Sequence, residues 1–238
     1  MTIGKNRKVV YTFLMGNYEN LKKPLVVSEG WDYICFTDNP LLESDIWDMR
    51  ICLPEYALEK DPKRKAMIHM IEYYKLFDEV YDNIISLPAG TLIRSDLNKF
   101  MNEINLGEHD MAILNHPWRN CLYKEAEEVA NTHLDHASVI NKQVMKYKKD
   151  KYPSNNGLWA TGIVVRNNQS ANLKKACEIW ATEYKQGSRR DQVSINYSFW
   201  KAAKQGHEVK TKLLPWAYTN SQYFIFDKHL NYKGRTVS

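Results

Sequence analysis

Hydrophobic positions in the first half of the chain follow two periods. Runs of β-branched and aromatic residues predict buried strands, and a helical spacing of apolar residues predicts a helix that Asp61 caps and Pro62 begins. The expected strands cover 8–15, 32–38, 47–54, 83–87 and 110–116, and 91–101 is typical of a strand followed by a short helix. This alternation predicts an α/β fold with a mainly parallel sheet, in which ligands bind beyond the carboxyl ends of the strands.

The second half is predicted to be helical around one strand. The strand is expected at 157–167, and helices are expected near 119–131, 136–149, 170–186 and 191–204. From about residue 216 the pattern loses its period and becomes basic, which is typical of either a covering strand with a loop or a mobile terminus. No repeat interrupts the pattern, so we expect one domain over 1–238.

Composition limits the class of protein. The chain has 238 residues, of which 44% are hydrophobic and 26% charged, as in soluble globular proteins. No apolar run approaches the roughly 20 residues that span a bilayer, and the first residues lack a signal-peptide hydrophobic region, so we expect no membrane span and a cytoplasmic location. The four scattered cysteines predict buried, reduced thiols. The net charge of +5 suits an anionic ligand, or only a lysine-rich surface.

Several common functional motifs are absent. The chain has no Gly-x-Ser-x-Gly, no Gly-x-x-x-x-Gly-Lys-Ser/Thr and no Gly-x-Gly-x-x-Gly, which disfavours hydrolase, phosphate-loop and dinucleotide functions. His133 and His136 with Asp135 are a weak metal-site candidate, and a polar helix end is the simpler interpretation. Lysines and aromatics interleave over 144–159, as in some nucleic-acid grooves, but their irregular spacing favours a solvated face, so no nucleic-acid partner is expected.

The stretch 115–126, "NHPWRNCLYKEA", places polar side chains directly after a predicted strand. They are His116, Arg119, Tyr123 and Glu125. Arg119 is suited to gripping a phosphate or carboxylate with two hydrogen bonds. The alternative is an Arg119–Glu125 pair that caps the following helix.

The stretch 152–162, "YPSNNGLWATG", combines amides and an indole in a turn before a strand. Asn155 and Asn156 suit sugar hydroxyls, and the indole of Trp159 suits the apolar face of a pyranose. Thr161 and Gly162 are small enough to allow close approach to a ligand. The alternative is a tight turn whose asparagines accept left-handed backbone angles.

The stretch 187–200, "GSRRDQVSINYSFW", begins a predicted helix with adjacent arginines. A helix start attracts anions and disfavours Arg189 and Arg190, so these arginines imply an anionic partner. Asp191, beside Gln192, is a candidate to pair with an arginine, to act as a base, or simply to cap the helix.

Three residues follow the first two predicted strands. Asn17 and Tyr18 come after the first strand, and Asp38 ends the second. These positions suit contact with a nucleotide base, and each residue taken singly is also an ordinary turn residue.

Five stretches in order resemble a glycosyltransferase-like family, formerly a domain of unknown function, with members in bacteria, viruses and plant wall-polysaccharide enzymes. They are "YTFLMGNYENLKKP", "DYICFTDNP", "HPWRNCLYKEA", "YPSNNGLWATGIVVRN" and "SRRDQVSINYSFWK". The resemblance runs from about residue 9 to 201. It implies a GT-A fold, with a Rossmann-like nucleotide-sugar half over about 8–116, a helical acceptor half over about 117–215, and a tail over 216–238.

The resemblance implies transfer of a sugar from a nucleoside diphosphate sugar, uridine-based, to a saccharide or glycoconjugate acceptor, as in polysaccharide biosynthesis. Asp191-Gln192 resembles the Asp-Gln element that lies under the transferred sugar in retaining galactosyltransferases. The nucleotide and its phosphates are then assigned to Asn17, Tyr18, Asp38, Arg119, Arg189 and Arg190. The sugar and acceptor are assigned to His116, Glu125, Asn155, Asn156, Trp159 and Thr161. In the tail, His229, Lys233 and Arg235 are expected to close over the diphosphate.

One turn departs from the family pattern. In "SLPAG", Pro88 stands where the family has the acid of its Asp-x-Asp element, and Ala89 and Gly90 also lack carboxylates. Mn²⁺ or Mg²⁺ needs such oxygen ligands, so no metal site is expected at this turn. Either arginines neutralise the diphosphate without a metal, or the enzyme is impaired. The alternative function is a non-enzymatic carbohydrate-binding module on a transferase scaffold.

Overall fold

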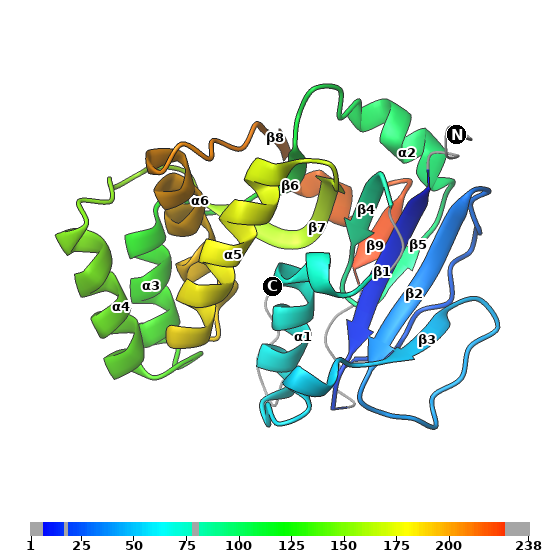
Figure 1. The fold of residues 1–238 in the computed structure, drawn as a ribbon, viewed down its shortest axis with the longest axis horizontal. Helices are drawn as coiled ribbons and strands as arrows, with labels where there is room; N and C mark the ends of the chain where they lie inside the picture. The colour runs from blue at the N-terminus through cyan, green and yellow to red at the C-terminus, as the bar shows by residue number, and fades with distance from the viewer. Residues whose placement is uncertain (1–6, 17–18, 78–80, 227–238) are drawn as a thin grey trace.

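The computed structural model describes residues 7–16, 19–77 and 81–226. A seven-stranded sheet forms its centre, in the order β3-β2-β1-β4-β7-β6-β8 (Figure 1). The strands are β1 (Lys8–Leu14), β2 (Trp31–Thr37), β3 (Asp48–Ile51), β4 (Asn83–Ser86), β6 (Met111–Asn115), β7 (Trp159–Asn167) and β8 (Thr211–Leu214). All neighbours are parallel except β7, which is antiparallel to both β4 and β6. The predicted α/β fold with a mainly parallel sheet is confirmed, and only β8 has no counterpart among the predicted strands.

The helices lie close to their predicted positions. They are α1 (Pro62–Ile71), α2 (Leu97–Ile104), α3 (Leu122–Asn131), α4 (Ala137–Lys149), α5 (Ala171–Gln186) and α6 (Ile195–Lys204), with short 3-10 turns η1 (Pro54–Tyr56), η2 (Tyr73–Lys75), η3 (Asp191–Val193) and η4 (Trp216–Thr219). Asp61 caps α1 as expected, by accepting from the backbone N–H groups of Lys63 and Arg64. The helix predicted from 191 is instead η3 followed by α6, because Ser194 separates them in a non-helical conformation.

Alternating strand residues divide the core between the two faces of the sheet. Val9 and Tyr11 face a cluster shared with α1, α5 and α6, whereas Val10 faces a cluster shared with α2. The second face is also covered by a small antiparallel sheet of β5 (Thr91–Ile93) and β9 (Phe224–Phe226). Of the two alternatives for the tail, the covering strand is present, and residues 227–238 lie outside the described part of the chain.

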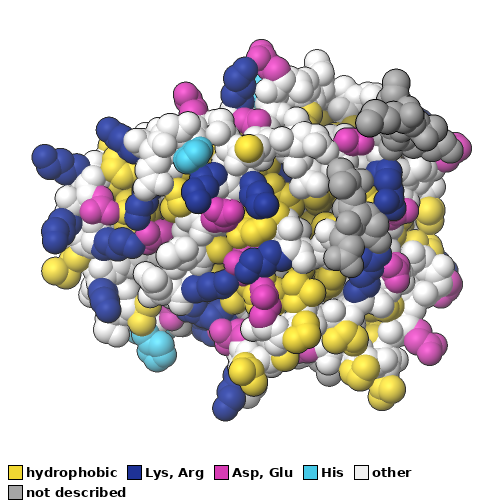
Figure 2. Space-filling model, in the orientation of Figure 1, with side chains coloured by type: hydrophobic (Ala, Val, Ile, Leu, Met, Phe, Trp, Pro, Cys, Tyr) yellow, Lys and Arg dark blue, Asp and Glu magenta, His cyan; other side chains and the backbone are white. Residues whose placement is uncertain are grey.

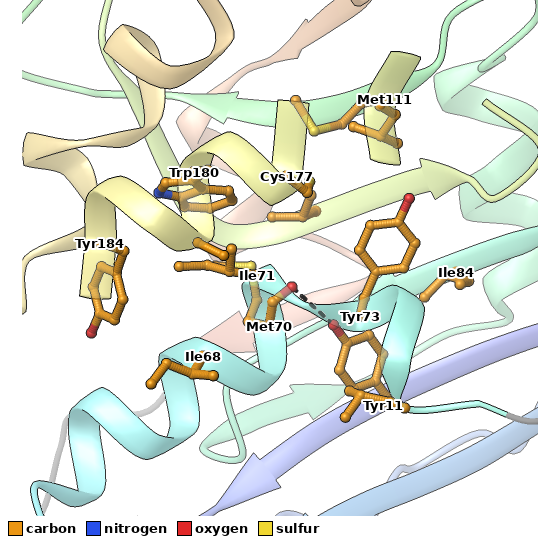
Figure 3. Close-up of a cluster of buried hydrophobic side chains, with 14 of the residues drawn as sticks. Tyr11, Ile68, Met70, Ile71, Tyr73, Ile84, Met111, Cys177, Trp180 and Tyr184 are labelled. Carbon is orange, nitrogen blue, oxygen red and sulfur yellow. Dashed lines mark hydrogen bonds between the residues drawn. The ribbon is translucent and has the colours of Figure 1, made fainter. Parts of the chain in front are cut away.

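The first core cluster joins α1 and α5 to the sheet (Figure 3). The hydroxyl of Tyr11 on β1 donates to the carbonyl of Met70 on α1, at 3.2 Å. Cys177 and Trp180 on α5 pack beside Met70, and both side chains are fully buried. All four cysteines are buried and unpaired, in agreement with the predicted thiols.

The weak metal candidate at the start of α4 is part of the scaffold. The carboxylate of Asp135 accepts from the Ser188 hydroxyl at 2.7 Å and from the Arg189 backbone N–H at 2.8 Å. His136 is the N-cap residue of α4. Within 7–16, 19–77 and 81–226, no group of three potential ligands could hold a metal. Asp135 thus fixes the loop that leads to η3, as the polar-helix-end interpretation predicts.

The lysine-rich stretch 144–159 forms the end of α4 and the following turn. Lys146 pairs with the Glu183 carboxylate at 2.6 Å, and the ring of Tyr147 is fully buried and stacks on Tyr197 with centroids 3.7 Å apart. Tyr152 is buried as well. These rings are held in the core and are not free to stack on bases. Lysine and arginine side chains are spread over the face in Figure 2 with acidic side chains between them.

Among the helices that the structure describes, none has both the length and the apolar character needed to cross a membrane.

Arg166 anchors β7 in the middle of the sheet. Its side chain is fully buried, and its guanidinium donates to the Ser86 hydroxyl of β4 at 2.9 Å and to the Met70 carbonyl at the end of α1 at 3.0 Å. The guanidinium also lies 4.7 Å from the ring centroid of Tyr73, where the ring face favours a cation. Arg166 therefore links β7, β4 and α1 through a single side chain.

We expect Arg166→Met to lower the free energy of unfolding by about 3 kcal/mol, because it removes the buried guanidinium that donates to the Ser86 hydroxyl and to the Met70 carbonyl, and Met70 then keeps the hydrogen bond from Tyr11. Urea unfolding followed by circular dichroism measures the change. Arg94→Met is the matched control, since Arg94 is exposed and should alter the value by less than about 0.5 kcal/mol. Equal effects of the two substitutions would show that Arg166 does not anchor the sheet.

Candidate active site

A pocket opens at the carboxyl ends of β1 and β4, the edge at which a ligand is expected in a parallel sheet. Its cavity volume is about 180 Å³. Its walls come from the end of β1 and the loop after it, the first two turns of α1, the turn after β4, the middle of β7, and η3. The lining residues are Phe13, Leu14, Met15, Glu19, Pro62, Lys63, Ala66, Met67, Pro88, Thr161, Gly162, Arg190, Asp191 and Gln192.

The "SLPAG" turn forms part of this pocket through Pro88. The carbonyl of Pro88 accepts from the Thr91 N–H at 3.0 Å, which closes the turn. The Gly90 N–H donates to the carboxylate of Glu19 at 2.9 Å. The turn has no acid of its own, but the loop after β1 places the carboxylate of Glu19 beside it.

Asp191 is held firmly at the wall of the pocket. Asp191 is 4% exposed, and its carboxylate accepts from the Thr161 hydroxyl of β7 at 2.6 Å. Its backbone carbonyl accepts from the Ser194 hydroxyl at 3.0 Å, and the same hydroxyl accepts from the Trp180 indole N–H. The carboxylate is therefore oriented by β7, while its backbone is fixed by α5 and α6.

Two cationic side chains line the same pocket. Arg190 donates to the side-chain oxygen of Gln192 at 3.0 Å, and its buried Nε has no hydrogen-bond partner among the residues that the structure describes. Lys63 projects from the first turn of α1. The pKa of Lys63 is lowered to about 8, mainly by burial and then by the nearby charge of Arg190, while the charge of Asp191 opposes the shift. The pocket thus offers two cations to an anion, beside the carboxylates of Glu19 and Asp191.

The lining residues do not fit a hard divalent cation. At a diphosphate, such an ion takes oxygen ligands from one or two carboxylates that are available to it, from waters and from the phosphates. The carboxylates here belong to Glu19 and Asp191, which are engaged with Gly90 and Thr161, and the pocket also holds two cations. In the described part of the chain, no cluster of three potential ligands occurs at the pocket or elsewhere.

The structure brings together four of the site residues predicted from sequence. Thr161, Arg190, Asp191 and Gln192 all line the pocket, where they meet Pro88 from the exceptional turn. Asn17 and Tyr18, and the tail residues His229, Lys233 and Arg235, lie outside the described residues.

Arg119 and Glu125 form the pair that the sequence offers as an alternative to ligand binding. The Arg119 Nε lies 2.5 Å from the buried Glu125 carboxylate in the first turn of α3. The His116 Nδ1 accepts from the backbone N–H groups of Trp118 and Arg119, and burial lowers the pKa of its imidazole. None of these side chains lines the pocket, and a ligand role for them stays a prediction.

Arg189 and Asp38 are also engaged within the protein. Arg189 donates to the Leu134 carbonyl at 3.1 Å and pairs with Asp61 at 3.2 Å. Asp38 accepts from the Gly16 N–H at 2.9 Å and from the Lys65 ammonium at 3.1 Å. These contacts fix the loops after β2 and before α1, and direct contact with a nucleotide stays a prediction.

The turn before β7 is exposed and lies apart from the pocket lining. Asn155 has a φ of 55°, the left-handed conformation that the tight-turn alternative predicts. Asn155 and Asn156 are exposed. The indole of Trp159 packs edge-on against Phe199 with centroids 5.1 Å apart. Sugar contacts by these three residues stay predictions.

Lys63 and Glu19 are the pocket residues that the sequence reasoning missed. Both lie at the carboxyl edge of the sheet. Glu19 is in the loop after β1, and Lys63 is the second residue of α1, after the N-cap Asp61. A rule that examines every charged residue in the loop after a parallel strand would have found Glu19. Lys63 lies among three basic residues at the start of α1, and only the helix orientation singles it out.

Comparisons with known proteins agree with the predicted fold. No curated protein sequence matches this chain. The bifunctional glycosyltransferase WbbM superposes with a TM-score of 0.53 at 12% identity, over 90% of this chain and 40% of WbbM. The chain therefore spans well under half the length of that relative. The galactosyltransferase LgtC matches with a TM-score of 0.46 at 11% identity, over 91% of this chain and 79% of LgtC. GlyE of Streptococcus pneumoniae matches with a TM-score of 0.42 at 13% identity, over 91% of this chain and 47% of GlyE.

The likeness to WbbM, together with the sheet order and the pocket at its carboxyl edge, confirms the predicted GT-A fold. The TOD1/MUCI70 glycosyltransferase-like domain matches residues 60–222, which include α1, the "SLPAG" turn, β7 and η3. Since this match covers more than half of the sequence, the chain belongs to the TOD1/MUCI70 glycosyltransferase-like family.

Proposed function

We propose that this protein transfers a sugar from a nucleoside diphosphate sugar, uridine-based, to a saccharide or glycoconjugate acceptor. One observation carries the proposal. A single pocket at the carboxyl edge of a GT-A sheet holds the Thr161-oriented carboxylate of Asp191 together with the cations of Lys63 and Arg190. Positive charge beside an oriented acid suits a substrate in which a diphosphate adjoins a sugar.

The diphosphate is assigned to Lys63 and Arg190. Three arginines are expected to bind phosphate, and of these Arg190 lines the pocket. The other two form ion pairs within the protein, Arg119 with Glu125 and Arg189 with Asp61. The side chain of Arg190 donates to the neutral Gln192, and its Nε has no hydrogen-bond partner among the described residues, so its charge is not neutralised by an acid there. Charge-assisted bonds to phosphate oxygens contribute about 1.5–3 kcal/mol each.

The reaction breaks the bond between the anomeric carbon and the diphosphate oxygen and forms a bond from that carbon to an acceptor oxygen. Negative charge grows on the diphosphate as it leaves, and the Lys63 and Arg190 charges stabilise it. The positive charge that develops on the sugar ring lies against the Asp191 carboxylate. The acceptor hydroxyl loses its proton in the same step, either to Asp191 or to the departing diphosphate.

A carbohydrate-binding module without transfer is the competing function, because the family's metal-binding acid is replaced by Pro88. The two functions differ in one measurable respect. The transferase binds a nucleoside diphosphate, whereas the module binds a glycan alone.

We expect Asp191→Asn to lower turnover at least about a hundredfold while it leaves the affinity for UDP within about twofold, because the amide keeps the shape but loses the charge that faces the sugar. Release of UDP from a panel of UDP-sugars measures turnover, and calorimetry with UDP measures affinity. Asp45→Asn is the control, since that carboxylate is exposed and pairs with Lys23 at the surface. If no nucleotide sugar binds the wild type, with or without Mn²⁺, the transferase proposal is wrong.

The affinity for UDP is expected to fall about tenfold as pH rises from 7 to 9. Only the protonated ammonium attracts phosphate, and the pKa of Lys63 is lowered to about 8, so its charge is present below pH 8 and is lost above it. Arg190, Asp191, Arg189 and Asp61 are the charged groups that act on Lys63.

Lys63→Arg is the matched variant for this pH dependence, because a guanidinium stays charged throughout the range. Any ionisation of the nucleotide itself affects both proteins equally. A wild-type affinity that follows the same curve as Lys63→Arg would remove Lys63 from the phosphate site.

EDTA should leave the affinity for UDP unchanged within about twofold, and added Mn²⁺ should raise it by no more than that, because the pocket offers cations rather than a set of metal ligands. Pro88→Asp, which places an acid near Glu19, tests the turn directly. Tighter UDP binding by that variant in Mn²⁺ would identify the turn as a lost metal site. Strong Mn²⁺ dependence of the wild type would contradict the assignment of the diphosphate to Lys63 and Arg190.

A further inference from the structure

Two indole rings lie together beyond the carboxyl ends of neighbouring strands. Trp118 follows β6 and Trp216 follows β8, and these strands are parallel with Leu114 opposite Leu214. The ring centroids are 6.2 Å apart, and the ring planes meet at 48°. We call Trp118 and Trp216 the indole pair. It lies at the same edge of the sheet as the pocket.

The two members of the indole pair differ in exposure. Trp216 is half-buried and packs against the core cluster under α2 and β9. Trp118 is 65% exposed, whereas Trp31, Trp47 and Trp180 are buried. Tryptophan is usually well buried, so an indole that is held at the surface by a second indole is a feature that hydrophobic burial alone does not explain.

The exposed ring is held in a fixed orientation. The backbone N–H groups of Trp118 and Arg119 both donate to the Nδ1 of His116, at 3.3 and 3.1 Å. The His116 ring also meets the Trp118 indole edge-on, with centroids 5.7 Å apart. His116 itself is 6% exposed, and its backbone N–H donates to the Leu158 carbonyl just before β7. A preorganised aromatic surface loses little conformational entropy when a ligand stacks on it.

The indole pair is linked to one wall of the pocket through His116. The His116 ring contacts Trp118, and the His116 backbone N–H donates to the Leu158 carbonyl at 2.9 Å, just before β7 begins. Three residues farther along, Thr161 of β7 lines the pocket and donates to the Asp191 carboxylate. The exposed indole and the acid that faces the reacting sugar are therefore both positioned by the start of β7.

We propose that the indole pair is a binding subsite for a pyranose ring of an extended saccharide acceptor. The apolar C–H face of a pyranose stacks on the exposed Trp118 indole, and its hydroxyls meet a polar rim that includes the exposed Asn115 and Asn120. The ring that receives the transferred sugar then lies near Asp191, and a ring farther along the acceptor lies on Trp118. The orientation of the acceptor, with its reacting end at Asp191, rests on the proposed function. The stacking of a sugar ring on Trp118 requires only the indole pair.

A single exposed indole with polar neighbours suits a sugar ring better than a protein partner. A stable protein interface buries about 800 Å² on each side around an apolar centre. Near Trp118 in the sequence lie the exposed Asn115 and Asn120 and the half-buried Arg119 instead, and these side chains are typical partners of hydroxyl groups.

The subsite predicts that acceptor length matters. Calorimetry should compare tetrasaccharides of glucose, galactose, mannose and N-acetylglucosamine with the corresponding monosaccharides on the wild-type chain. We expect at least one tetrasaccharide to bind about tenfold more tightly than its monosaccharide, and Trp118→Ala to remove most of this difference. Trp118→Phe should keep part of it, because a smaller ring still stacks.

Met145→Ala is the matched control, because Met145 is an exposed apolar side chain on α4 and should not affect glycan binding. Titration with UDP is the second readout, and Trp118→Ala should leave that affinity unchanged. Glycan binding that depends on Trp118 without any UDP binding would support the subsite and contradict the transferase. The subsite is overturned if no tetrasaccharide binds more tightly than its monosaccharide, or if Trp118→Ala retains the wild-type difference.

Discussion

The insertion of β7 between β4 and β6 is the constraint on which the rest of the molecule depends. This strand is antiparallel to both neighbours, so its first half lies at the edge where β1 and β4 end. The buried guanidinium of Arg166 fixes its position by binding Ser86 and Met70. Thr161 and Gly162 consequently face the pocket, and the two halves of the chain share a continuous sheet.

Gly162 shows how closely this wall of the pocket is packed. A Cβ at that position would lie 2.5 Å from the ring of Phe226 on β9. Because Gly162 has no side chain, β9 can pack behind β7 at this position. The neighbouring Thr161 donates to the Asp191 carboxylate. The covering sheet of β5 and β9 thus shapes the pocket from behind, although β9 is distant in sequence from the other walls.

The charged side chains around the pocket fall into two groups, those that form ion pairs within the protein and those that face the cavity. Arg189 with Asp61, and Arg119 with Glu125, are paired outside the lining and hold loops in place. Lys63, Arg190, Asp191 and Glu19 face the cavity instead. Arg189 forms an ion pair with Asp61, whereas Arg190 donates to the neutral side-chain amide of Gln192. One arginine of this adjacent pair is therefore structural, and the other is available to an anion.

The sequence by itself determined the fold class, most element positions and four of the pocket residues, because hydrophobic period, helix caps and local motifs act over short stretches of chain. The resemblance to the family, in which an acid stands at the position of Pro88, is what marked this turn as exceptional. Only the tertiary structure decided which charged residues share the cavity. Lys63 and Glu19 reach it because α1 and the loop after β1 converge on the turn after β4, and β8 became a strand because β6 offered a free edge. Such contacts depend on the packing of distant segments, which the local pattern of residues does not encode.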